Sequence, residues 1–155
     1  MEYLTTHDLI WINEMVTGKV QPYNYVTLEA CMAGQYSYGR STEVVPQAAT
    51  LLELLLGKSP FLEGNRRTAF LATLTFLNAN GYATTVTDAQ AVETLEKVAE
   101  GRLAALQAIT DMAAPATHPL PGGITLRKLI MHECNLHTEA LKALAAKDVA
   151  VAMVR

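Results

Sequence analysis

The most constraining feature of this sequence is a segment, residues 47–56, that is apolar almost all the way around a helix. Pro46 suits the first position of a helix and Gly57 suits its end, so the segment is predicted to form one helix. A helix without a polar face belongs in a protein core, because no side of it gains from contact with water. The sequence therefore predicts a folded domain whose other elements surround this buried helix.

Composition indicates that those surrounding elements are helices too. The chain contains 23 alanines and 21 leucines against 11 valines and 5 isoleucines. β-Branched side chains lose more freedom in a helix than small or straight ones do, so this ratio favours helix over strand. Half of the 155 residues are apolar and the net charge is only −3, which argues against intrinsic disorder. We expect an all-α fold without a pair of strands.

Capping residues and helix-ending glycines divide the first part of the chain. Thr5 or Thr6 suits the cap of a first helix, Asn24 that of a second, and Thr87 with Gln90 has the spacing of a capping box. Besides the buried helix, the predicted helices span approximately residues 6–16, 24–33, 65–80, 87–100 and 102–112.

The C-terminal part of the chain differs from the rest. Three prolines and two adjacent glycines mark residues 113–124 as a linker between a domain at residues 1–112 and an extension at residues 125–155. Leucines at helical spacing predict one long helix over residues 125–147. Such an added helix packs on its own domain, exchanges with a neighbour in a homo-oligomer, or binds a partner.

Charge and apolar patterning exclude two classes of partner. A pI near 5.8 lacks the basic footprint that general nucleic-acid binding needs, so no direct nucleic-acid partner is expected. The longest strongly apolar stretch, residues 48–56, is too short to span a bilayer, so no membrane association is expected either.

Cysteines and histidines carry little chemistry in this sequence. Cys31 and Cys134 are expected to be small core residues of a cytoplasmic protein, because no signal peptide is recognisable at the N-terminus. His132 and His137 are five residues apart, about 140° around a helix, whereas a helical zinc motif needs a spacing of four. Structural or surface roles are therefore expected for the histidines.

The stretch from Ser59 to Ala69 is the part of the sequence that indicates chemistry. A tight loop with a proline and a glycine leads into a helix that starts with Asn65, Arg66 and Arg67. Free backbone N–H groups at a helix start bind anions, and two arginines are unfavourable there by about 0.3–1 kcal/mol each unless an anion accompanies them. With the neighbouring Glu63 the pattern indicates a phosphate and Mg²⁺ site. The alternative is a capped helix with solvated arginines.

The same stretch resembles the signature of the Fic/Doc (Fido) family, His-Pro-Phe-x-Asp/Glu-Gly/Ala-Asn-Gly/Lys-Arg, with Ser59 in place of the histidine. It is most similar to the Doc (death-on-curing) branch, and the resemblance covers approximately residues 4–112, with further matching runs at residues 48–57, 67–69 and 76–82. The resemblance implies a compact helical Fido fold to which the C-terminal helix is added. Phe61 would be the core anchor of the loop.

The resemblance also implies an activity, namely transfer of a phosphoryl or AMP group from ATP or another nucleotide to a protein hydroxyl. Doc proteins act on elongation factor Tu as the toxin of a toxin–antitoxin pair, so a protein acceptor and an antitoxin are the implied partners. The loop around Tyr36, Tyr38 and Arg40 is placed where the family positions its target.

Roles carry over residue by residue. Glu63 would hold Mg²⁺, and the backbone at Gly64, Asn65 and Arg66 with the Asn65 side chain would form the anion hole. Arg67 would pair with a phosphate, and Arg66 keeps the charge of the lysine that is commonest in Doc proteins.

Two departures from the family pattern affect the expected activity. Fic enzymes carry a second arginine where this chain has Phe70, which again favours the Doc branch. Ser59 replaces the general base, and losing a positioned base typically costs about 100- to 10,000-fold in rate. A natural loss of activity, a base supplied from elsewhere and an engineered replacement all remain as explanations. The sequence thus predicts either an impaired Fic/Doc-type transferase or an inactive Fido pseudoenzyme that binds a nucleotide or a protein.

Overall fold

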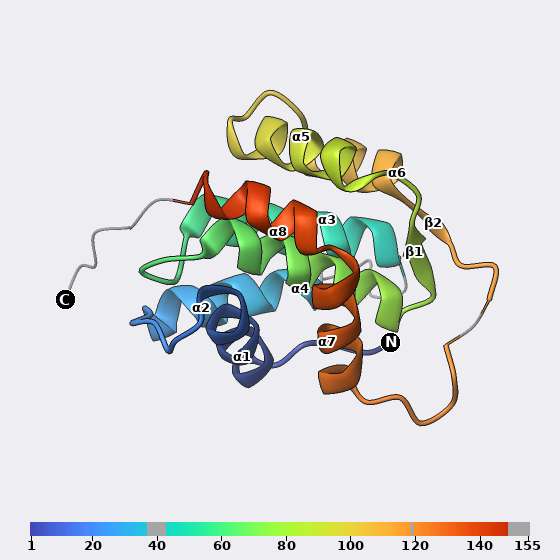
Figure 1. Cartoon of the computed structure of the whole chain (residues 1–155), viewed down its shortest axis with the longest axis horizontal. Coiled ribbons are helices and arrows are strands. Elements are labelled where there is room, and N and C mark those ends of the chain that lie inside the picture. Colours follow the sequence, from blue (N-terminus) through green and yellow to red (C-terminus); the bar gives the residue numbers. More distant parts are fainter. Residues whose placement is uncertain (37–42, 119, 149–155) are drawn as a thin grey trace.

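The computed structural model describes residues 1–36, 43–118 and 120–148 of the chain, and Figure 1 shows their arrangement. The described part is mostly helical, as predicted. Its elements are α1 (Thr6–Thr17), α2 (Tyr25–Ala33), the 3₁₀ turn η1 (Gly34–Tyr36), α3 (Val44–Lys58), α4 (Asn65–Ala79), β1 (Tyr82–Thr84), α5 (Asp88–Ala99), α6 (Ala105–Met112), β2 (Ala113–Pro115), α7 (Leu126–Leu136) and α8 (Thr138–Ala145).

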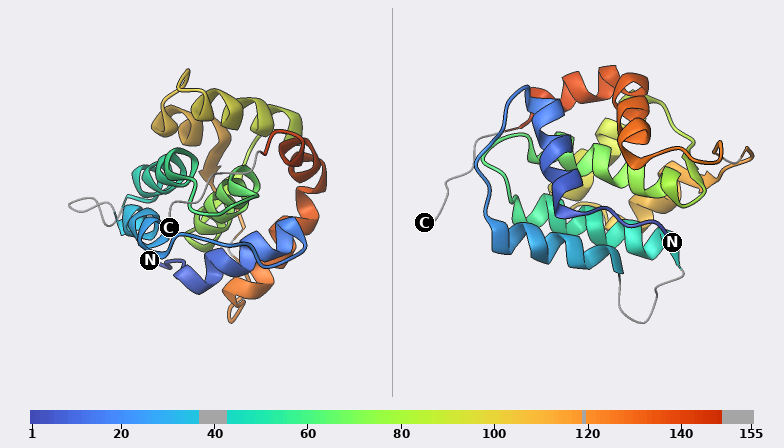
Figure 2. Two further views of the ribbon diagram at one scale, coloured as in Figure 1. Left: turned by 90° about the vertical axis from the view of Figure 1, so that its left-hand side faces the viewer. Right: turned by 90° about the horizontal axis from the view of Figure 1, so that it is seen from below.

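Helix α4 is the centre of the molecule. Every residue from 68 to 77 in α4 is buried, and the left view of Figure 2 shows α4 inside a ring formed by the other helices. The prediction that residues 47–56 form the most buried helix is therefore wrong in part. Helix α3 covers one side of α4, and its own outer face, which includes Glu53, is exposed.

Threonines explain why sequence patterning did not indicate α4 as the central helix. Three of its buried side chains are threonines, which makes α4 look more polar than α3. The Thr75 hydroxyl donates to the carbonyl of Leu71 at 2.8 Å, and the Thr68 hydroxyl accepts from Asn13 Nδ2 at 3.1 Å. Because these two hydroxyls are satisfied inside the core, their burial costs little, whereas the buried Thr73 hydroxyl has no hydrogen-bond partner among the described residues.

The predicted starts of α1, α2 and α5 are confirmed, whereas α3 begins at Val44, before Pro46, and continues through Gly57 to Lys58. Thr5 and Asp8 form a reciprocal capping box at the start of α1, and Thr87 with Gln90 does the same at the start of α5. The Asn24 side chain accepts from the N–H of Thr27 at 3.0 Å and caps α2. These starts were predictable because each cap is made within three residues of sequence.

A small sheet corrects the expectation of no paired strands. Strand β1 pairs with β2 in an antiparallel register that matches Tyr82 with Pro115. Strand β2 occupies the beginning of the predicted linker, and α6 begins at Ala105, three residues later than predicted. Strands of three residues are too short to display an alternating pattern, so the sequence had no signal for them.

The predicted long C-terminal helix is in fact two helices, α7 and α8, that meet at His137. Both pack on the body of the same chain, against α4, α5 and α1. Ile130, Ala140 and Leu144 belong to the same hydrophobic core as the residues of α4. Of the three arrangements considered for this segment, the described residues show the first, in which it packs on its own domain.

Neither cysteine forms a disulfide. Burial raises the pKa of the Cys31 thiol to about 11, and burial also raises the pKa of Cys134. Both therefore stay protonated near neutral pH; Cys31 is a small core side chain as predicted, whereas Cys134 is only partly buried. Of the described helices, none has the length and apolar character that crossing a bilayer demands.

Candidate functional site

The loop between α3 and α4 is held by backbone contacts to the segment before α2. Ser59 ends α3 in the left-handed conformation, with φ of 44°, and its hydroxyl donates to the carbonyl of Leu56 at 3.4 Å. The Asn24 N–H donates to the carbonyl of Pro60 at 2.9 Å, and the Leu62 N–H donates to the carbonyl of residue 22 at 2.9 Å. The loop is therefore fixed in the folded protein.

Two side chains hold the middle of the loop. Phe61 is buried, as the family resemblance implied. The Asn65 amide oxygen accepts from the N–H of Phe61 at 3.0 Å, and its nitrogen donates to the carbonyl of Phe61 at 2.7 Å. The Asn65 side chain, predicted to be part of the anion hole, thus shapes the loop by bonding to its backbone.

Gly64 lets the chain turn into α4. It has φ of 81°, and a Cβ atom there would clash with Thr17 and would lie 3.1 Å from Asn13 Nδ2. Asn13 also donates to the carbonyl of Glu63 at 2.8 Å, which ties the turn to α1. Since Gly64 has no side chain, the first N–H groups of α4 receive no local cap and can bind an anion from elsewhere.

That anion is the carboxylate of Asp148, which follows α8. Asp148 Oδ1 accepts from the Arg66 N–H at 2.8 Å, and Oδ2 accepts from Arg67 Nε at 2.6 Å. Arg67 Nη1 also donates to the carbonyl of Val16 at 2.6 Å, which fixes the guanidinium. The Asp148 side chain is only 6% exposed. The start of α4 is thus a formed anion site that holds a buried carboxylate.

The two arginines contribute differently to this site. Both were predicted to add positive charge to one anion, but only the Arg67 guanidinium contacts it. The Arg66 side chain pairs with Glu96 of α5, and Arg66 meets the anion through its backbone N–H. Arg66 therefore fastens α5 to α4, while Arg67 supplies the charge.

Glu63 fits the predicted Mg²⁺ role without forming a complete metal site. It is exposed and lies directly before Gly64, at the edge of the anion site. Among the described residues no group of three or more metal-ligating side chains occurs. Mg²⁺ commonly takes one carboxylate, with substrate phosphates and waters as the other ligands. Glu63 therefore suits a metal ion that arrives with a phosphate.

A cavity of about 380 Å³ opens beside Arg67. It lies between α1 and the two C-terminal helices, and its lining includes Val16, Cys134 and Leu141. The charged residues among those that line it are Arg67 and Lys142, both cationic. This cavity is suited to a ligand that joins an apolar group to an anionic one.

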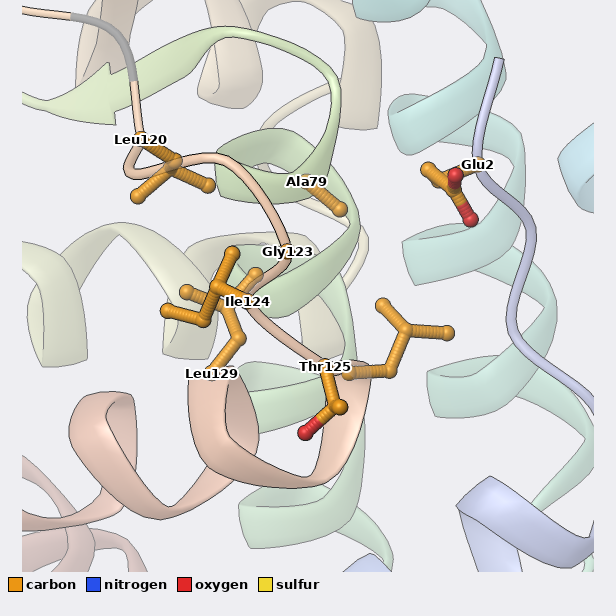
Figure 3. A pocket seen from close by; sticks show the side chains of 8 residues that line it. Glu2, Ala79, Leu120, Gly123, Ile124, Thr125 and Leu129 are labelled. Carbon is orange, nitrogen blue, oxygen red and sulfur yellow. The ribbon is translucent and has the colours of Figure 1, made fainter.

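A second cavity, of about 360 Å³, lies at the opposite end of α4 and differs in charge. Figure 3 shows it between Glu2 on one side and Leu120, Ile124 and Leu129 on the other. Glu2 is the charged residue among those that line it, so this cavity does not suit an anion.

Among the described residues, no histidine forms a hydrogen bond with Ser59. His7, His118 and His132 are exposed, and His137 is buried against the ring of Phe70 with ring centroids 5.6 Å apart. Phe70 stands where Fic enzymes have a second arginine, and here it lies in the core under the α7–α8 junction.

His137 is the centre of another charged cluster, which sequence reasoning missed. Its Nδ1 lies 2.8 Å from Asp88 Oδ1 and its Nε2 lies 3.1 Å from Glu133 Oε2. The neighbouring Glu133 carboxylate raises the pKa of His137, burial opposes this, and Asp88 raises the pKa further. The Asn78 amide donates to Glu133 at 2.6 Å. The cluster joins α7 and α8 to α4 and α5.

The sequence indicated the donors of the anion site but missed its present anion. Asp148 lies 82 residues after Arg66, and it carries no local motif. The predicted target-positioning residues Tyr38 and Arg40 lie outside the described residues, whereas Tyr36 is described and packs on Tyr3.

Comparisons of the chain with family models, with curated proteins and with solved structures return no match. The arguments for function therefore rest on the motif residues and on the geometry of the loop and α4.

Proposed function

We propose that this chain is a Fic/Doc-type protein of the Fido fold that binds a nucleotide with Mg²⁺ at the start of α4. The observation that carries the proposal is the convergence of the Arg66 N–H and Arg67 Nε on one carboxylate. A phosphate offers oxygens to the same two donors, and a helix start with a guanidinium is a common phosphate site. The position of these donors, directly after the signature loop, supports the family resemblance.

Each site residue has a role in the proposed binding. Arg67 neutralises charge on the phosphate, and Gly64 leaves the N–H groups of α4 open to it. Asn65 keeps the loop in shape through its bonds to Phe61. Glu63 would hold Mg²⁺, which stabilises negative charge on the phosphates when bound. The cavity between α1 and α8 offers room for the rest of the nucleotide.

The proposed reaction is transfer of a phosphoryl or AMP group to a protein hydroxyl, and Ser59 impairs it. The acceptor oxygen forms a bond to phosphorus, the bond from phosphorus to the leaving group breaks, and the hydroxyl proton passes to a base. Ser59 is un-ionised near neutral pH and accepts no proton there, and its hydroxyl lies against the carbonyl of Leu56. Elongation factor Tu is the acceptor in the Doc branch, and an antitoxin is the second proposed partner.

The second candidate function is an inactive Fido module that binds a nucleotide or a protein without turnover. The observation that favours it is Ser59, whose hydroxyl bonds to the carbonyl of Leu56. Both candidates need the same anion site and differ only in transfer.

Two experiments test these candidates. Isothermal titration with ATP and Mg²⁺ is expected to show binding to the wild type and about 10- to 100-fold weaker binding to Arg67→Ala, because a charge-assisted hydrogen bond is lost. Arg102→Ala is the matched control, since Arg102 is exposed and pairs with Glu100. Equal affinities for the wild type and Arg67→Ala would contradict the site.

Label transfer separates the transferase from the inactive module. Ser59→His is expected to raise transfer from labelled ATP to proteins of a cell extract by about 100- to 10,000-fold over the wild type. A Ser59→His variant that binds ATP and still transfers nothing favours the inactive module.

A further inference from the structure

We propose that Asp148 is a built-in competitor for the anion site, so that a phosphate binds only when the Asp148 carboxylate leaves. This inference rests on the proposed phosphate binding at the start of α4. It adds that the C-terminal segment regulates that binding from within the same chain.

The first step is that both ligands need the same donors. Each carboxylate oxygen of Asp148 occupies one donor, Oδ1 the Arg66 N–H and Oδ2 Arg67 Nε. The proposed phosphate would bind the same two groups. The Asp148 side chain is 6% exposed and that of Arg67 16%, so the space around the two donors is filled. Carboxylate and phosphate therefore exclude each other.

The second step is that Asp148 is held on a short tether. Its N–H donates to the carbonyl of Leu144 at 2.9 Å, and the Lys147 N–H donates to the same carbonyl at 3.0 Å. Leu144 is fully buried, whereas residues 145–147 are exposed. Opening this last turn frees the carboxylate and leaves the apolar face of α8 in the core. Figure 1 shows the end of α8 on the same side of the molecule as the loop that leads into α4.

The third step is that this carboxylate differs from the other caps of the N-terminal helices. Helices α1, α2 and α5 are capped by side chains within three residues of their starts. Helix α4 has no such cap and takes a carboxylate from a segment that arrives after six further elements. A remote carboxylate that is paired with an arginine resembles a bound anion more than it resembles a local cap.

Competition predicts a definite change in affinity. An anion at a helix start is worth up to about 2 kcal/mol in partly buried sites, which corresponds to about 30-fold in an equilibrium constant. A ligand that must displace this anion binds only the molecules in which the site is free, and its apparent affinity is reduced by that fraction. Removing the Asp148 carboxylate should therefore strengthen phosphate binding by roughly five- to thirty-fold.

The test is isothermal titration of the full-length chain with ATP and Mg²⁺, and separately with inorganic phosphate. We expect Asp148→Ala to bind both about five- to thirty-fold more tightly than the wild type. Asp148→Asn keeps the shape of the side chain and its ability to accept the Arg66 N–H, so it should fall between the two. Asp111→Ala is the matched control, because Asp111 is exposed and bonds only to Gln107 among the described residues.

The outcomes separate this inference from the proposed function. Equal affinities of the wild type, Asp148→Ala and Asp111→Ala would overturn the competition and leave the phosphate site in place. Weaker binding by Asp148→Ala would also overturn it, because Asp148 would then act as a ligand of Mg²⁺. If folded Asp148→Ala, checked by its melting transition, binds neither ATP nor phosphate, both the phosphate site and the competition are wrong.

Discussion

In the described part of the chain, two helix starts receive a carboxylate from a distant segment, and they are built differently. At α4 the carboxylate is Asp148, and its cationic partner is Arg67. At α8 the carboxylate is Asp88, which accepts from the Ala140 N–H at 3.0 Å and from the ring of His137 at 2.8 Å. The contact of Asp148 with the start of α4, here called the α4 junction, lies beside the loop at residues 59–64. The contact of Asp88 with the start of α8, the α8 junction, lies at the corner between α7 and α8.

The difference lies in how firmly each carboxylate is held. Asp88 opens α5, a helix fixed by its own capping box and by packing on α8 and α6, so it cannot leave without disturbing the fold. Asp148 follows the last turn of α8 and is held by backbone bonds to Leu144. An anion at a helix start is therefore not in itself evidence of a ligand site. An anion at a helix start indicates a ligand site only where another anion can replace it and its partner, here Arg67, is permanently charged.

The largest expected effect concerns the α8 junction. His137→Ala should destabilise the protein by about 3–5 kcal/mol, because it leaves the buried carboxylate of Glu133 and that of Asp88 without their cationic partner. Denaturant unfolding measures this loss. Replacing the exposed His132 by alanine is the control and should cost less than about 0.5 kcal/mol. A loss below about 1 kcal/mol for His137→Ala would show that the cluster is not structural.

A smaller effect of the same junction is a dependence of stability on pH. The pKa of His137 is raised in the folded protein, chiefly by the neighbouring Glu133 carboxylate. This contribution to stability is complete below the ordinary histidine pKa of about 6.5 and is lost as the pH rises through the raised value. Unfolding measured from pH 6 to pH 9 should show falling stability in the wild type. The fall of the free energy of unfolding with pH should be less steep in His137→Gln. An equally steep fall in this variant would show that other groups cause the pH dependence.

The α4 junction should contribute less to stability than the α8 junction does. Asp148→Ala should destabilise the fold by about 1–2 kcal/mol, because a helix cap and its pairing with Arg67 are lost while Arg67 keeps its bond to Val16. Denaturant unfolding of Asp148→Ala and His137→Ala side by side tests the comparison. A greater loss for Asp148→Ala than for His137→Ala would reverse it, and Asp148 would then be a structural cap.

The smallest expected effect concerns the loop itself. Ser59 adopts a left-handed conformation that side-chain-bearing residues tolerate poorly, at a cost of order 1 kcal/mol. Ser59→Gly should therefore stabilise the protein by up to about 0.5 kcal/mol, because the greater freedom of unfolded glycine offsets about 0.5–1 kcal/mol of the relieved strain. Thermal unfolding measures the change. A destabilised Ser59→Gly would mean that the bond from the Ser59 hydroxyl to Leu56 matters more than the backbone strain.

The parts of this structure that local chemistry determines were predictable from the sequence. The caps Thr5 and Thr87 and the helix start after Gly64 depend on residues within a few positions of one another. The central place of α4 was not predictable, because its buried threonines make it look polar, and the partners of Thr75 and Thr68, a helix carbonyl and Asn13, become visible only in the fold. The break at His137 likewise has no glycine or proline to mark it, since contacts with Asp88 and Glu133 fix it.

The candidate site divides in the same way. Sequence spacing identified Arg67 and the N–H groups of α4 as anion donors, because they are adjacent in the chain. It could not tell that the Arg66 side chain turns to Glu96 or that Asp148 occupies the site, since both contacts join segments far apart in sequence. Tertiary packing alone determines these pairings.

The most direct measurement compares two backbone amides during one titration. In ¹H–¹⁵N spectra of the full chain, the amide of Arg66 reports the anion at α4 and the amide of Ala140 reports the anion at α8. Adding inorganic phosphate, or ATP with Mg²⁺, should shift the Arg66 amide in a saturable manner and leave the Ala140 amide in place. A titration that moves the Ala140 amide instead, or moves neither, would contradict a replaceable anion at the start of α4.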